Sequence, residues 1–158
     1  METPYIISII VFLPAVSGLL MMLIPGYKKK LFYKIALVIG LITFLLSVVV
    51  FVSYDIDAAG YQMIDQFEWL PALGINYYVA VDGISAPLVL LTGLVMFTGV
   101  IISQRIDDRP REFFAFLFLL ATGVFGVFVS LDMFVLFFFY EIAVFPMYIL
   151  ISVWGWKE

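Results

Sequence analysis

The sequence contains neither cysteine nor histidine among its 158 residues. Their absence removes the usual ligands of iron–sulfur clusters and haem, and the nitrogen and sulfur ligands of zinc. It also excludes catalysis by a cysteine nucleophile or a histidine base. Neither common glycine-rich phosphate-binding loop is present. We therefore expect no cofactor on this chain, and any redox reaction in which it takes part must occur on another chain.

Charged residues are also scarce. They make up 13% of the chain, whereas 65% is hydrophobic and the mean hydropathy is +1.18. An ordinary soluble domain is about 25% charged and about 45–50% apolar. Because a chain of this size cannot bury so much apolar surface within itself, lipid must be its solvent. The sequence predicts one transmembrane domain over residues 1–158, without a separate soluble domain. The few charges, with a net charge of −4, argue against nucleic acid as a partner.

Five apolar stretches have the length of about 17–25 residues that a membrane-spanning helix needs. The sequence therefore predicts an all-α membrane protein with helices at about 4–24, 31–53, 84–103, 113–130 and 133–154. No basic residue precedes the first apolar run, so we interpret it as a retained helix and not as a cleaved signal peptide. Only Leu131 and Asp132 separate the last two stretches, which predicts a tight antiparallel pair.

The basic residues indicate how these helices cross the membrane. Every lysine and arginine falls in or beside the first and third connections, or after the fifth helix: Lys28, Lys29, Lys30, Lys34, Arg105, Arg109, Arg111 and Lys157. Basic loops are typically cytoplasmic. The N-terminus, the second connection and the turn at Asp132 are therefore predicted to face outward.

The second connection, residues 54–81, is the only long polar segment. Apolar residues recur at every second position on both sides of residues 71–74, which predicts an outward-facing hairpin. Its tyrosines and tryptophan suit the membrane interface. We expect it to pack on a neighbouring subunit, with an ordinary loop as the alternative. Asp82 follows and is predicted to cap the third helix, although a role in proton chemistry stays open.

Glu141 is the main candidate for a functional residue. It lies nine residues after Asp132, about 13 Å along a helix. If Asp132 marks the surface of a hydrocarbon core about 30 Å thick, Glu141 is close to the midplane. A charged side chain there costs about 2.5–3.5 kcal/mol, and such residues are usually functional. We predict that Glu141 is a proton carrier; the alternative is a neutral glutamic acid bonded to another helix.

Other polar groups accompany Glu141 in the fifth helix. Tyr148 and Ser152 follow it by seven and eleven residues and so fall on one stripe. Pro146 has no N–H to donate to the carbonyl of Ile142. The carboxylate, the freed carbonyl and the hydroxyls together would suit a water-filled proton path. Asp132 and Asp82 are further candidates at the outer helix ends. In the fourth helix, Thr122, Gly126 and Ser130 recur every four residues and predict a packing face.

Short segments distributed along the chain carry a family resemblance: Trp69-Leu70-Pro71, residues 74–78, residues 81–85, Ser130-Leu131-Asp132, Tyr140-Glu141 followed by Pro146-Met147-Tyr148, and Trp154-Gly155. Together they resemble subunit M of proton-pumping NADH-quinone oxidoreductase, respiratory complex I. The same subunit is called NADH dehydrogenase chain 4 in mitochondria, and chloroplasts and cyanobacteria have an equivalent.

The resemblance implies an antiporter-like subunit of over a dozen helices in two inverted bundles, of which this chain would be the N-terminal part. It implies a translocase in the cytoplasmic membrane or an energy-transducing organelle membrane. FMN, iron–sulfur clusters and quinone would belong to partner subunits, and the partners would be other antiporter-like and membrane-arm subunits. In the family, the glutamate matching Glu141 pairs with a lysine two helices later, and that pair gates proton movement in response to quinone reduction.

Two other interpretations remain. The homologous subunit of a multisubunit Na⁺/H⁺ antiporter shares the fold but has no redox partners. A structural subunit of five helices, needed only for assembly, is the other alternative. The segments at residues 69–78 and 82–85 favour the redox complex.

Overall fold

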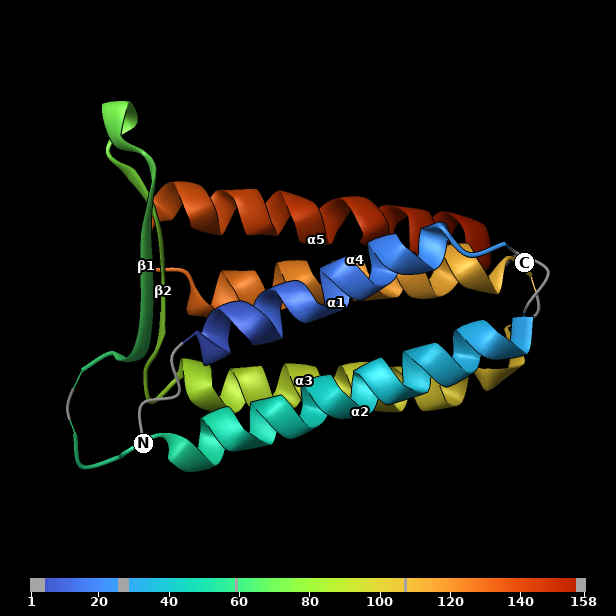
Figure 1. Ribbon diagram of the computed structural model, residues 1–158, viewed down its shortest axis with the longest axis horizontal. Coiled ribbons are helices and arrows are strands. Elements are labelled where there is room, and N and C mark those ends of the chain that lie inside the picture. Colours follow the sequence, from blue (N-terminus) through green and yellow to red (C-terminus); the bar gives the residue numbers. More distant parts are fainter. Residues whose placement is uncertain (1–4, 26–28, 59, 107, 156–158) are drawn as a thin grey trace.

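The computed structural model describes residues 5–25, 29–58, 60–106 and 108–155. These residues form five α-helices and one two-stranded antiparallel sheet (Figure 1). The elements, in chain order, are α1 Ile6–Met22, α2 Lys29–Ser53, β1 Gln62–Leu70, the short 3-10 helix η1 Pro71–Leu73, β2 Ile75–Val81, α3 Ser85–Ile102, the 3-10 helix η2 Ser103–Arg105, α4 Pro110–Val129 and α5 Met133–Trp154.

The predicted helical membrane fold is confirmed. Helices α2 to α5 are long and apolar enough to cross a membrane, and α1 is a shorter apolar helix of 17 residues. The first predicted helix is therefore too long at both ends. Pro4 lies outside the described residues, and at the other end Pro25 disfavours a helical conformation of the residue before it. The last turn of α1 closes with a tighter bond, from Leu23 N–H to Leu20 O at 3.1 Å.

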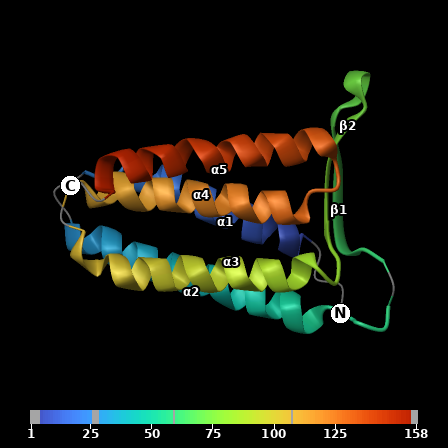
Figure 2. The ribbon, with the colours of Figure 1, turned by 180° about the vertical axis from the view of Figure 1, so that it is seen from behind.

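The helices lie side by side along a common direction, and α4 lies between α1 and α5 (Figures 1 and 2). Small residues make this arrangement possible. A Cβ added at Gly123 of α4 would lie 2.7 Å from the Cβ of Ala143 in α5, and one at Gly126 would overlap the ring of Phe139. Towards α1, a Cβ added at Gly18 would lie 3.0 Å from the carbonyl oxygen of Ala115. The predicted tight α4–α5 pair and the packing role of Gly126 are confirmed.

Strands β1 and β2 form the predicted hairpin, which lies across one end of the helices (Figure 1). The chain reverses at Gly74, whose φ of 68° is in the left-handed region that glycine adopts readily. The predicted alternation is not followed in burial, because Val79, Ala80 and Val81 are all buried. The end of β2 is covered on both faces, since Val79 also pairs with Ser130 at the end of α4.

The two ends of the bundle differ in charge. The hairpin and the α4–α5 turn form one end, which we call the hairpin end. The other, which we call the basic end, carries the described basic residues near the start of α2, at the end of η2 and at the start of α4: Lys30, Lys34, Arg105, Arg109 and Arg111. Lys28 and Lys157 lie outside the described residues, as does Trp156, and the side chain of Lys29 is not described.

Candidate functional site

Glu141 lies near the middle of the 22-residue helix α5, on the face that points away from α4. The residues that α5 buries are Val135, Phe139 and Pro146, whereas Glu141 is exposed. Tyr148, 71% exposed, and Ser152 are also exposed. The predicted stripe of Glu141, Tyr148 and Ser152 is therefore present.

The surroundings of Glu141 on this face are aromatic. Exposed phenyl rings occupy the positions seven, four and three residues before it and four residues after it: Phe134, Phe137, Phe138 and Phe145. Neither of the two ion pairs formed by the described residues includes Glu141, because both lie at the start of α4. A carboxylate between phenyl rings would be poorly solvated in lipid, so this face requires a protein or water neighbour that supplies polar groups.

Pro146 lies on the opposite side of α5 from Glu141. Its side chain is buried, and Ile142, whose carbonyl it leaves without a helical donor, is packed against the core. Five residues along a helix correspond to a rotation of about 140°. The prediction of one water path lined by the carboxylate and the freed carbonyl is therefore wrong in its geometry. The carboxylate faces outward, whereas the proline faces α4.

Asp132 caps the start of α5. Its Oδ1 accepts hydrogen bonds from the N–H groups of Phe134, at 2.8 Å, and Val135, at 3.2 Å. Its Oδ2 accepts from the N–H of Asn76 in the hairpin at 3.3 Å. These bonds, that of Val135 above all, lower the pKa of the Asp132 carboxyl and keep it ionised. Asp132 thus fixes the helix that carries Glu141 to the hairpin.

Asp82 caps α3, as predicted. Its Oδ1 accepts from the N–H groups of Ile84, at 3.0 Å, and Ser85, at 2.7 Å, and the Ser85 hydroxyl accepts from the Asp82 N–H at 2.8 Å. This reciprocal arrangement satisfies donors that a helix start otherwise leaves free. The N–H of Ser85 is the main reason why the pKa of Asp82 is lowered. Of the four predicted site residues, only Glu141 and Tyr148 share a face.

A buried carboxylate in the hairpin was not predicted from the sequence. Asp65 of β1 is only 5% exposed, and its Oδ2 accepts from both the N–H of Ser8, at 3.0 Å, and its hydroxyl, at 2.7 Å. The Tyr77 hydroxyl donates to the Ser8 hydroxyl at 3.2 Å. Burial, and secondarily the charge of Asp65, raises the pKa of Tyr77. Asp65 therefore supplies the acceptor that the start of α1 lacks, and it places a negative charge at the positive end of that helix.

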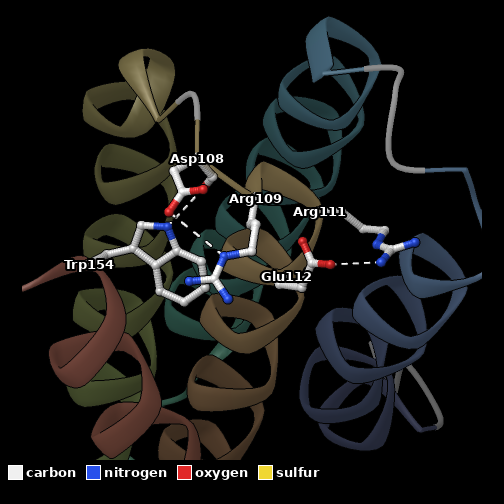
Figure 3. A network of polar contacts seen from close by, with 5 residues as sticks. All are labelled: Asp108, Arg109, Arg111, Glu112 and Trp154. Carbon is white, nitrogen blue, oxygen red and sulfur yellow. Dashed lines mark hydrogen bonds and ion pairs between the residues drawn. The ribbon is translucent and has the colours of Figure 1, made fainter.

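The end of α5 is fixed by a second polar group of contacts, at the basic end (Figure 3). The indole N–H of Trp154 donates to the carbonyl of Asp108 at 2.8 Å. The guanidinium of Arg109 lies 5.4 Å from the centre of the Trp154 ring and 3.7 Å from the Asp108 carboxylate. Beside them, Arg111 pairs with Glu112 at 2.7 Å. Helix α5 is thus held at both ends and along α4, while the face with Glu141 is left open.

The geometry can be compared with known proteins. No protein-family model matches the chain. A chain 4 of NAD(P)H-quinone oxidoreductase from Picosynechococcus sp. is 42% identical over 99% of this chain and 28% of its own length. Another chain 4, from Microcystis aeruginosa, is 38% identical over 96% of this chain and 28% of its own length. The chain is related to NAD(P)H-quinone oxidoreductase chain 4.

A solved structure agrees with this relationship to chain 4. Respiratory complex I from Thermus thermophilus with bound NADH contains a chain that matches 94% of this one with a TM-score of 0.78 at 25% identity. The match covers 29% of that chain. The family resemblance predicted from the short segments is therefore confirmed. The chain spans somewhat more than a quarter of the length of the chain 4 relatives that it matches.

Proposed function

We propose that the chain is part of a proton-translocating membrane subunit of a complex I-like oxidoreductase that transfers electrons from NAD(P)H, or another donor, to quinone. The relationship to chain 4 and the similarity to a chain of respiratory complex I support this proposal. FMN, iron–sulfur clusters and quinone are assigned to partner subunits. The proposed partners are other antiporter-like and membrane-arm subunits. The proposed location is the cytoplasmic membrane or an energy-transducing organelle membrane.

One observation carries the mechanistic part of the proposal: Glu141 lies near the middle of an apolar helix, on an open aromatic face. A bare carboxylate there is costly in lipid, and its protonation depends on what covers it. A nearby cation lowers the pKa of a carboxyl, whereas burial raises it. A cation that approaches and withdraws would therefore make Glu141 release and bind a proton. The family resemblance implies such a cation, a lysine two helices later in the subunit.

The other predicted residues take different parts in the proposal. Asp132 and Asp82 position helices α5 and α3 through the backbone bonds described above, and we do not assign them proton transfer. Tyr148 is about 10 Å from Glu141 along the helix axis, too far for a direct hydrogen bond. We assign it as the next polar group on the path, connected to Glu141 through water.

The test is Glu141→Gln in the complete assembled complex, reconstituted in liposomes. Glutamine keeps the shape but cannot exchange a proton. We expect the number of protons pumped per electron to fall and quinone reduction to slow, with a smaller loss for Tyr148→Phe. Glu68→Gln is the matched control, since Glu68 is an exposed carboxylate of the hairpin, and it should leave both quantities unchanged. An unchanged proton-to-electron ratio in Glu141→Gln would refute the assigned role.

The two remaining interpretations predict other results. If the chain belonged to a Na⁺/H⁺ antiporter, only antiporter subunits would co-purify with it. If it served assembly alone, Glu141→Ala would reduce the amount of complex but not the pumping of the complex that forms. The names of the chain 4 relatives favour the redox assignment.

A further inference from the structure

Thr122 is a buried polar side chain for which the fold so far gives no role. It lies in α4, is 2% exposed, and its hydroxyl has no hydrogen-bond partner among the described residues. Other buried hydroxyls behave differently: those of Ser17, Thr43 and Ser47 each donate to a carbonyl of their own helix, at 2.7–2.9 Å. A buried hydroxyl without a partner lowers stability, so this exception calls for a physical reason.

The packing of α1 on α4 shows what Thr122 faces. Helices α1 and α4 are antiparallel, and Gly18 of α1 lies against Ala115 and Phe118 of α4. Thr122 falls between Ala115 and Phe118 in direction around α4, one turn nearer the hairpin end. One turn from Gly18 in the same direction along α1 is Pro14, which is buried. Thr122 and Pro14 are therefore at the same level of the α1–α4 contact.

Pro14 creates a second group without its usual partner. Proline has no N–H, so the carbonyl of Ile10 lacks the donor that a helix normally provides four residues on. Ile10 is fully buried, and a buried carbonyl needs a hydrogen bond. Proline in membrane helices is tolerated where side chains such as threonine, or ordered water, satisfy the freed carbonyl. Thr122 is the unpartnered hydroxyl at this level, but no acceptor among the described residues lies within hydrogen-bond distance of it.

We propose that an internal water molecule binds between α1 and α4, accepting a hydrogen bond from the Thr122 hydroxyl and donating one to the carbonyl of Ile10. A water with two such partners satisfies both groups at once. The site lies on the α1 side of α4, whereas Glu141 points away from α4 on α5. It therefore stands independently of the proposed role of Glu141. It also gives Thr122 a role beyond the helix packing predicted from the sequence.

The test uses the complete assembled complex. In a high-resolution cryo-electron microscopy map, we expect density for a water within hydrogen-bond distance of Thr122 Oγ1 and Ile10 O, and no such density in Thr122→Val. Valine has the same shape without the hydroxyl and should lower the unfolding midpoint of the subunit by roughly 2–4 °C. Thr122→Ser keeps the hydroxyl and is the matched control, with a smaller change.

A double mutant links the two groups. Pro14→Ala restores an N–H to the carbonyl of Ile10, so Thr122→Val should lower the midpoint less in that background than in the wild type. Three results would overturn the proposal. One is a midpoint in Thr122→Val equal to or above that of the wild type, as expected if the hydroxyl has no partner at all. The others are equal effects in both backgrounds, or a map in which Thr122 donates directly to a carbonyl.

Discussion

The contact between α4 and α5 allows a quantitative test of how the helix carrying Glu141 is positioned. A Cβ added at Gly123 would lie 2.5 Å from the backbone nitrogen of Ala143 and 2.7 Å from its Cα and Cβ. Carbon atoms in contact are normally about 3.5–4.0 Å apart. The obstacle is mainly backbone, which cannot rotate away as a long side chain would. In Gly123→Ala the two helices must therefore separate by about 1 Å.

Overpacking of this kind costs about 1–3 kcal/mol. Alanine also favours a helix over glycine by about 1 kcal/mol, which partly offsets that cost. Gly99 of α3 separates the two effects, because a Cβ there would meet nothing within 4 Å. Gly99→Ala should be as stable as the wild type or more so, and Gly123→Ala should lie below it by about 1–3 kcal/mol.

The assay is the unfolding midpoint of both variants in the purified complex, together with the proton-to-electron ratio. Because α5 moves with the contact, Gly123→Ala should also pump less, whereas Gly99→Ala should not. If the two variants had the same midpoint, the close approach of α4 and α5 would not be a determinant of stability, and the positioning of Glu141 would need another explanation.

Two further predictions concern the carboxylates at the hairpin end. Asp65→Ala leaves the N–H and hydroxyl of Ser8 without their acceptor and should destabilise the protein by about 1–3 kcal/mol, whereas the exposed Asp57→Ala should not; equal unfolding midpoints would contradict this. The pKa of Asp132 is lowered in the folded protein, mainly by the N–H of Val135. Its stabilising effect is therefore complete above the unfolded pKa of about 3.9 and is lost as the pH falls through the lower folded value. The wild type should unfold at a higher temperature than Asp132→Asn at pH 7, and this difference should disappear in a pH series extended well below 4; a difference that persists would refute the assignment.

The sequence predicts α5 well because local signals at both ends agree with its apolar run. Asp132 supplies the side chain that accepts from the first N–H groups, and Gly155 follows the last helical residue. The predicted bounds of 133–154 match the structure. The hairpin was predicted by its alternation and by the turn at Gly74. Its burial was not, because the position of Val79 against Ser130 depends on how the bundle is assembled.

The candidate site shows the same division. Helical spacing alone placed Glu141, Tyr148 and Ser152 on one stripe. The rotation of about 140° between Glu141 and Pro146 was available from the same spacing and excludes their joint water path. Asp65 could have been found, because it interrupts an otherwise apolar row in β1, between Met63 and Phe67.

Contacts between distant segments could not be predicted. The indole of Trp154 reaches the carbonyl of Asp108, 46 residues away. That contact depends on the path of the connection between α3 and α4, for which the sequence gives only the basic charge. The tertiary acceptor that Asp65 gives to Ser8, 57 residues away, is of the same kind.

The order of residues along the open face of α5 bears on the direction from which protons would reach Glu141 in the proposed function. Towards the hairpin end, phenyl rings follow one another on this stripe from Glu141 to Phe134, without a polar side chain between them. Towards the basic end, Tyr148 and Ser152 supply hydroxyl groups at intervals of one to two turns. Water chains form along polar groups and not along phenyl rings. Since the basic end is predicted to be cytoplasmic, we infer that Glu141 takes up its proton from that side, and that exit on the hairpin side requires polar groups from another part of the subunit.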